Sequence, residues 1–163
     1  MADHPNLKKN PNATVSTIHA LTSLASTVTQ IIIDNGVSQS DFTELDLSRF
    51  LQLKSLSVGD HCFSYANEVK VIGLNELESV VIGMNSFTKK SDYGNDPNRH
   101  FYLKNCPKLK SLKMGRYSFS DYNVFEIENV DALEVIEIGD LNELSNNFDS
   151  ATLELKSILS HSK

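Results

Sequence analysis

LKSLSVGDHCF, the stretch from Leu53 to Phe63, recurs three more times along the chain. The other copies are LESVVIGMNSF from Leu77, LKSLKMGRYSF from Leu109 and LEVIEIGDLNE from Leu133. The first leucines are 24, 32 and 24 residues apart, so a period of 24 is broken once, by eight additional residues between Phe87 and Phe101. Recurrence at such a period indicates similar structural units stacked on one another.

A second stretch precedes each copy of the first: LDLSRFLQL from Leu45, VKVIGLNEL from Val69, FYLKNCPKL from Phe101 and FEIENVDAL from Phe125. Its first and third places are apolar, which is typical of a short strand because neighbouring side chains on a strand point to opposite faces. Its sixth place is predicted to turn inward at a corner (Phe50, Leu74, Cys106, Val130). Each unit should therefore hold two short strands joined by bends, with Phe63, Phe87 and Phe119 stacked in one column.

The apolar places of the first stretch match the leucine-rich repeat template, and three of the four copies match it fully. Over about Gln30 to Phe148, the two stretches together resemble the BspA-like branch of leucine-rich repeat proteins. That resemblance implies a mainly β, right-handed leucine-rich repeat solenoid of short parallel strands in about five coils, similar to many microbial surface and adhesion proteins. The chain has glycine where that branch has Ile-Pro, and these glycines are expected to permit an unusual backbone angle (Gly59, Gly83, Gly115, Gly139).

The length of 163 residues and the 40% hydrophobic content suit one domain with a packed core. We predict a flexible N-terminal segment over residues 1–16, the solenoid over 17–158 with a loop insertion within 87–101, and a tail over 159–163. Residues 17–33 are interpreted as a degenerate first coil, and the stretch from Ala151 as a final strand. The sequence contains no apolar run of membrane-spanning length and no signal-peptide pattern. As written, the chain is expected in the cytoplasm; as a fragment of a larger protein, it is expected at the cell surface.

Charge is segregated along the chain, whose net charge is -6. Residues 99–116 contain six Lys or Arg and no acid, whereas residues 121–154 contain ten acids and no Lys or Arg. The acidic part would repel a phosphate backbone, which argues against nucleic-acid binding. Columns of alternating sign are also predicted, and each is expected to fix the stacking register rather than bind a ligand: Lys54-Glu78-Lys110-Glu134, Asp46-Lys70, Lys104-Glu128 and Lys113-Glu137.

The residue types that carry chemistry are scattered. No histidine forms a close-spaced ligand pair with another His or Cys (His4, His19, His61, His100, His161). His61 is interpreted as a turn residue, and Cys62 and Cys106 as buried fillers rather than a disulfide or metal ligands. We therefore predict no catalytic residues, no cofactor and no metal site, and a protein that is not an enzyme.

The insertion SDYGNDPNR, residues 91–99, loosely resembles a calcium-binding loop. Leu103 stands where such a loop requires a bidentate Glu. We therefore predict a plain surface loop, projecting from one face and lying at the margin of a binding site.

These patterns predict a protein–protein interaction module that binds an unknown protein, rather than a small molecule, on its exposed strand face. The alternative is a structural or adhesive fragment of a larger repeat-array surface protein. The predicted partner-binding residues are those that the leucine-rich repeat template places on the outward face of the strands. They combine exposed apolar side chains with charged ones: Ser57, Asp60, Val81, Met84, Lys113, Arg116, Glu137 and Asp140. The expected partner has an acidic rim that meets Lys113 and Arg116.

Overall fold

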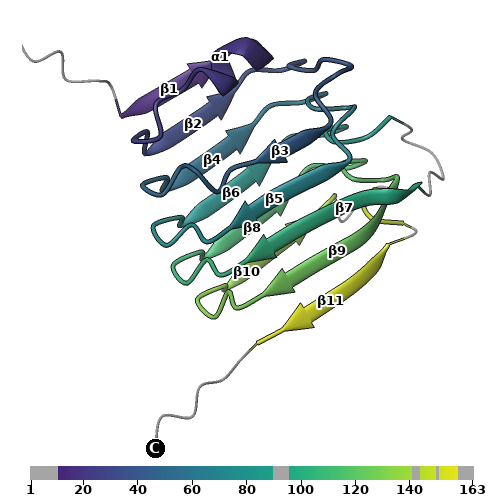
Figure 1. Cartoon of the computed structure of the whole chain (residues 1–163). Coiled ribbons are helices and arrows are strands. Elements are labelled where there is room, and N and C mark those ends of the chain that lie inside the picture. The colour runs from purple at the N-terminus through teal and green to yellow at the C-terminus, as the bar shows by residue number, and fades with distance from the viewer. Residues whose placement is uncertain (1–10, 90–95, 141–143, 150, 158–163) are drawn as a thin grey trace, which may run out of the picture.

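The computed structural model describes residues 11–89, 96–140, 144–149 and 151–157. Its fold is mainly β, with two parallel sheets of short strands (Figure 1). Sheet A contains, in spatial order, β1 (Asn12–Val15), β2 (Gln30–Ile33), β4 (Ser55–Val58), β6 (Ser79–Ile82), β8 (Ser111–Met114) and β10 (Val135–Ile138). Sheet B contains β3 (Glu44–Asp46), β5 (Glu68–Ile72), β7 (Asp96–Lys104), β9 (Tyr122–Glu128) and β11 (Thr152–Lys156). From β2 onward, consecutive strands belong to opposite sheets.

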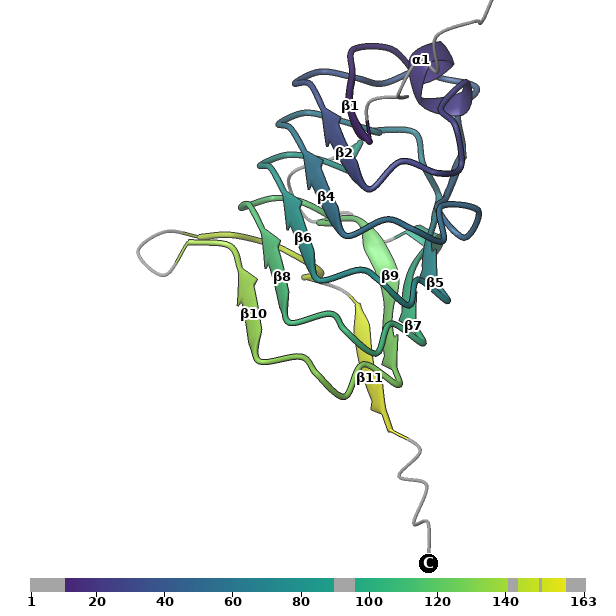
Figure 2. The same ribbon diagram turned by 90° about the vertical axis from the view of Figure 1, so that its left-hand side faces the viewer.

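The core lies between the two sheets, which face each other in Figure 2. Strand β6 illustrates the cause: Val80 and Ile82 are 1% and 3% exposed, whereas the alternate residue Val81 is 41% exposed. Val80 lies opposite Leu56 and Leu112 in the neighbouring strands, so equivalent apolar residues form continuous buried columns. The 24-residue period therefore sets the register of the sheets.

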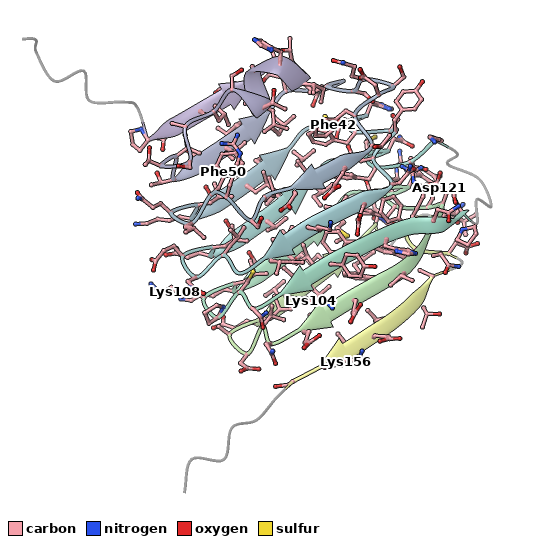
Figure 3. The ribbon with its side chains drawn as sticks, in the orientation of Figure 1. Phe42, Phe50, Lys104, Lys108, Asp121 and Lys156 are labelled. Atoms are coloured by element: carbon pink, nitrogen blue, oxygen red, sulfur yellow. The ribbon has the colours of Figure 1, made fainter. Side chains whose placement is uncertain are left out.

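A stacked aromatic column fills the space beside the strands, as predicted. The Phe63 and Phe87 ring centroids are 5.1 Å apart, and those of Phe87 and Phe119 are 4.7 Å apart. Phe148 extends the stack by a further 4.9 Å step, and Phe42, labelled in Figure 3, packs in a tilted orientation on Phe63. The predicted inward corners are also confirmed for Phe50, Leu74 and Cys106, each at most 2% exposed, whereas Val130 is only partly buried.

One short helix, α1 (Ile18–Thr22), follows β1 and is the single helix among the described residues. Thr17 caps it, because the Thr17 Oγ1 accepts a hydrogen bond from the Ala20 N–H at 3.1 Å. Ile18 and Leu21 are buried, so α1 covers this end of the core. The Arg49 guanidinium donates to three carbonyl oxygens at the helix C-terminus, those of Leu21, Thr22 and Leu24. The sequence predicted little helix, and it did not predict α1.

Two segment predictions differ from the structure. Strand β1 lies inside the segment 1–16 that was predicted to be flexible, and it pairs with β2 in parallel. Strand β7 begins at Asp96, inside the predicted loop insertion, and not at Phe101. The predicted final strand is confirmed as β11. Residues 91–95 and the predicted tail 159–163 lie outside the described residues.

Candidate functional site

The outward face of sheet A brings four of the predicted partner-binding residues into one row. Ser57, Val81, Lys113 and Glu137 occupy equivalent places on β4, β6, β8 and β10 and lie opposite one another in the sheet register. None of the four side chains is buried. Lys113 Nζ lies 3.2 Å from Glu137 Oε2, as the predicted charge column requires. The row therefore passes from neutral and apolar to charged across the sheet.

The other four predicted residues follow the strands of sheet A, each directly after a glycine. Asp60 and Met84 are joined, since Asp60 Oδ1 accepts a hydrogen bond from the Met84 N–H at 2.8 Å. The Asp140 N–H donates to Ser145 Oγ at 2.7 Å. The Arg116 guanidinium lies 5.7 Å from the centroid of the Tyr117 ring. These contacts fix the turn backbone and leave parts of the Met84 and Arg116 side chains at the surface.

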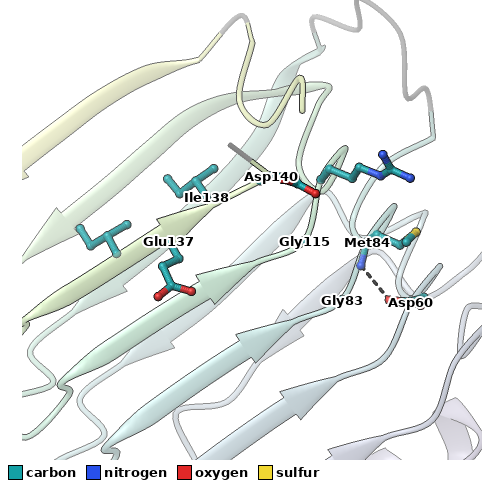
Figure 4. Close-up of a pocket in the computed structure, with 10 residues that line it drawn as sticks. Asp60, Gly83, Met84, Gly115, Glu137, Ile138 and Asp140 are labelled. Atoms are coloured by element: carbon teal, nitrogen blue, oxygen red, sulfur yellow. Dashed lines mark hydrogen bonds between the residues drawn. The ribbon is translucent and has the colours of Figure 1, made fainter. Parts of the chain in front are cut away.

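An open hollow of about 1000 Å³ lies where the carboxyl ends of β6, β8 and β10 meet these turns (Figure 4). Five predicted residues line it, together with three glycines and two isoleucines that were not predicted: Asp60, Met84, Arg116, Glu137, Asp140, Gly83, Gly115, Gly139, Ile136 and Ile138. The lining combines three carboxylates, those of Asp60, Glu137 and Asp140, with the Arg116 guanidinium and the Met84 thioether. Such a mixture of charge around apolar atoms is typical of a protein-binding surface.

The glycines after the sheet A strands permit close stacking of the turns. A Cβ at Gly83 would lie 2.6 Å from the Gly59 carbonyl carbon, and a Cβ at Gly115 would lie 2.5 Å from the Met84 nitrogen. Of the four repeat glycines, only Gly139 has a positive φ, 74°. An unusual backbone angle is therefore not the general reason for glycine at these four places, and that prediction is wrong. Backbone of one turn passes directly over the glycine of the next, which excludes a side chain there.

Serine hydroxyls beneath the hollow hold successive turns together. Ser86 Oγ donates to the Gly59 carbonyl at 2.8 Å, and Ser118 Oγ donates to the Gly83 carbonyl at 2.6 Å. The Ser86 N–H in turn donates to Ser118 Oγ at 3.1 Å. Both serines are 0% exposed, so these bonds are shielded from water. These bonds therefore join three successive turns, those that carry Gly59, Ser86 and Ser118.

Charge pairs cover the outer face of sheet B, where Figure 3 labels Lys104 and Lys156. Lys104 Nζ lies 2.8 Å from Glu126 and 3.5 Å from Glu128, the predicted partner. The Lys104 ammonium holds the pKa of Glu126 below its usual value, although partial burial acts in the opposite direction. Asp46 lies opposite Lys70 in the register, but the Lys70 ammonium pairs with Glu44 at 2.8 Å and with Glu68 at 3.4 Å.

The predicted column Lys54-Glu78-Lys110-Glu134 is connected through the backbone. The Glu78 N–H donates to the Lys54 carbonyl, and the same bond recurs from Lys110 to Glu78 and from Glu134 to Lys110. Among the described residues, no ion pair within 4.0 Å joins neighbouring side chains of this column. The oppositely charged side chains of this column therefore lie in adjacent layers without forming ion pairs with one another.

A buried ion pair was not foreseen from the sequence. Arg99 is 0% exposed and its Nη1 lies 2.6 Å from Asp121 Oδ2. Its Nη2 donates to the carbonyls of Ser64 and Ala66, at 2.8 and 2.7 Å. Burial raises the pKa of the Tyr122 hydroxyl, which donates to the same Ala66 carbonyl. The plain surface loop predicted for residues 91–99 is thus wrong for Arg99, and the described part of this insertion belongs to sheet B, away from the sheet A face.

Cys62 and Cys106 are free, buried thiols, as predicted. Burial raises the pKa of both thiols, and each Sγ lies against a backbone carbonyl, Asp34 for Cys62 and Val71 for Cys106. His61 occupies a turn with a φ of 57°, which agrees with its interpretation as a turn residue. Within the described ranges, no group of three or more His, Cys, Asp or Glu is arranged to hold a metal ion.

Among the residues that the structure describes, no helix is long and apolar enough to cross a membrane. Comparison with known proteins finds no matching family model, no matching curated protein and no matching solved structure.

Proposed function

We propose that this chain is a right-handed leucine-rich repeat solenoid of about five coils that acts as a protein–protein interaction module. Two features support the solenoid. Strands alternate between two parallel sheets, and equivalent residues of successive repeats lie opposite one another. The BspA-like resemblance of the sequence points to the same arrangement.

One observation favours binding on the sheet A face. Five of the eight residues selected from the sequence line the same open hollow, and the remaining three continue from it along the outward row of β4, β6 and β8. Val81 is 41% exposed beside this hollow. The exposed Val81 side chain does not contribute to the core. Met84 and Arg116 are of residue types that are enriched at protein–protein interfaces. The proposed activity is recognition, with no chemistry on the bound partner.

Affinity capture with mass spectrometry tests this proposal. The wild-type chain and the double variant Met84→Asp with Arg116→Glu are used in parallel, and folding of each is checked by circular dichroism. The matched control is Leu51→Asp with Lys54→Glu, which makes the same kinds of change before β4, at the opposite ends of the sheet A strands. We expect a partner that the wild type and the control capture and the double variant does not. Equal capture by all three folded chains would place binding elsewhere.

The second candidate is a structural or adhesive piece of a longer repeat array. The exposed apolar residues of β10 and β11 favour it, because they resemble a core layer that another repeat could cover. Solution scattering distinguishes the candidates: chains that assemble end to end through this layer support the array, and a monomer that binds an unrelated protein through sheet A supports the interaction module.

A further inference from the structure

The final strands of both sheets expose side chains whose equivalents in the neighbouring strand are buried. Ile136 is 43% exposed, whereas Leu112, opposite it on β8, is 0% exposed. Leu155 is 63% exposed, whereas Ile127, opposite it on β9, is 3% exposed. Ile138 and Leu153 show the same difference from their neighbours. These four residues define the end layer, and a hollow of about 290 Å³ opens between Ile136 and Leu155.

The opposite end of the stack is covered. Helix α1 lies over it in Figures 1 and 2, with Ile18 and Leu21 buried, and Val15 of the edge strand is 0% exposed. Arg49 fastens this cover through its bonds to the helix carbonyls. The two ends thus differ in their apolar side chains: α1 covers them at one end, whereas at the other end they are exposed beside β10, which like β1 is an edge strand of sheet A.

Charge identifies what fits the end layer. Beneath β10, the basic strand β8 supplies Lys113, which bonds Glu137 at 3.2 Å, while the Glu137 side chain remains 59% exposed on its other side. Glu134, which directly precedes β10, is also exposed. A second copy that met this end through its own end layer would bring Glu134 and Glu137 against identical carboxylates, which is unfavourable. A strand with Lys or Arg between apolar residues would repeat the contact that β8 already makes with β10.

We propose that the end layer binds a strand of a second protein in which Lys or Arg alternates with apolar residues, added to the open edge of β10. Backbone hydrogen bonds from the edge, apolar contacts with Ile136 and Leu155, and an ion pair with Glu137 like the one that Lys113 makes would each contribute. The end layer shares Ile136 and Ile138 with the hollow on the sheet A face, which Glu137 also lines. The inference rests on the edge of β10 and on the exposed layer, and not on the function proposed above.

The probe is the peptide LKSLKMGRYSF, the chain's own residues 109–119, which has the required alternation. Its matched control replaces Lys110, Lys113 and Arg116 of the peptide with Glu. Backbone hydrogen exchange of the full chain is measured while each peptide is titrated. We expect saturable protection of the β10 amides by the basic peptide, weakened by salt, and none by the acidic one. Ile136→Ser with Leu155→Ser should weaken the affinity at least about tenfold, and Leu51→Ser should not.

Four results would overturn the inference. The first is protection of the β10 edge in the free chain, which would mean that it is already covered. The second is equal protection by both peptides, which would remove the role of charge. The third is a concentration-dependent dimer through the end layer, which would identify a second copy as the partner. Loss of protection at β6 or β8 on adding the peptide would also contradict it, because that indicates strand exchange rather than addition to an edge.

Discussion

Removing the Arg99 guanidinium is expected to destabilise the fold strongly. In Arg99→Met, the side chain keeps most of its length, but Asp121, only 6% exposed, loses the partner at 2.6 Å. The Ser64 carbonyl also loses its donor, whereas the Ala66 carbonyl keeps the Tyr122 hydroxyl. Breaking one side of a buried ion pair typically costs about 3–5 kcal/mol, because an uncompensated charge remains in the interior. Since a domain of this size is stable by about 5–15 kcal/mol, this is a large fraction of the total.

Urea denaturation followed by circular dichroism measures the effect. With a slope near 2 kcal/mol/M, the midpoint should fall by about 2 M. The control Lys108→Met removes an ion pair of similar length, 2.8 Å from Glu76, whose side chains are 54% and 42% exposed. Its midpoint should hardly move, because exposed pairs contribute little. The double variant Arg99→Met with Asp121→Leu should recover part of the loss. Equal midpoint shifts in Arg99→Met and Lys108→Met would mean that burial does not make the Arg99–Asp121 pair more important than an exposed one.

Three further outcomes follow from the packing and the pKa shifts. Phe87→Ala should cost about 3–5 kcal/mol, since a 0% exposed ring leaves a gap in the aromatic column; a urea midpoint near that of the wild type would contradict the stacking. Bonding to Lys104 lowers the pKa of Glu126 from 4.5. The stabilising contribution of Glu126 is therefore present above pH 4.5 and is lost as the pH falls through the folded-state pKa. Glu126→Gln should therefore flatten the acid limb of a pH–stability curve. Cys62 and Cys106 should react with a disulfide reagent at pH 8 only after unfolding, and a rapidly modified thiol in the native protein would conflict with their burial.

The register and the core columns were predictable because both depend on local alternation repeated at a fixed period. Val80 and its equivalents are apolar at every second place, and a one-residue slip would expose all of them. The glycines were located correctly, but their cause lies in contacts between turns 24 or more residues apart, as at Gly83 and Gly59. No local pattern reports such an approach of two backbones.

The burial of Arg99 and the exposure of Ile136 could not be predicted, and the cause differs from that at the glycines. Arg99 lies in an irregular insertion, where no equivalent residue in another repeat indicates whether the side chain points inward. The pairing of Arg99 with Asp121 depends on β7 and β9 lying side by side, which the sequence alone does not indicate. The exposure of Ile136 is the opposite case, since its sequence context matches that of the buried Leu112. Burial there depends on a covering layer and not on the strand itself.

The most direct measurement of the proposed function is the affinity of the captured partner for three purified chains, determined by titration at low and high salt. We expect Met84→Asp with Arg116→Glu to weaken binding by about 30-fold or more, which corresponds to a loss of about 2 kcal/mol or more at the centre of an interface. The control Leu51→Asp with Lys54→Glu should bind as the wild type does. Equal affinities of all three chains, with circular dichroism spectra unchanged, would contradict recognition through the sheet A face.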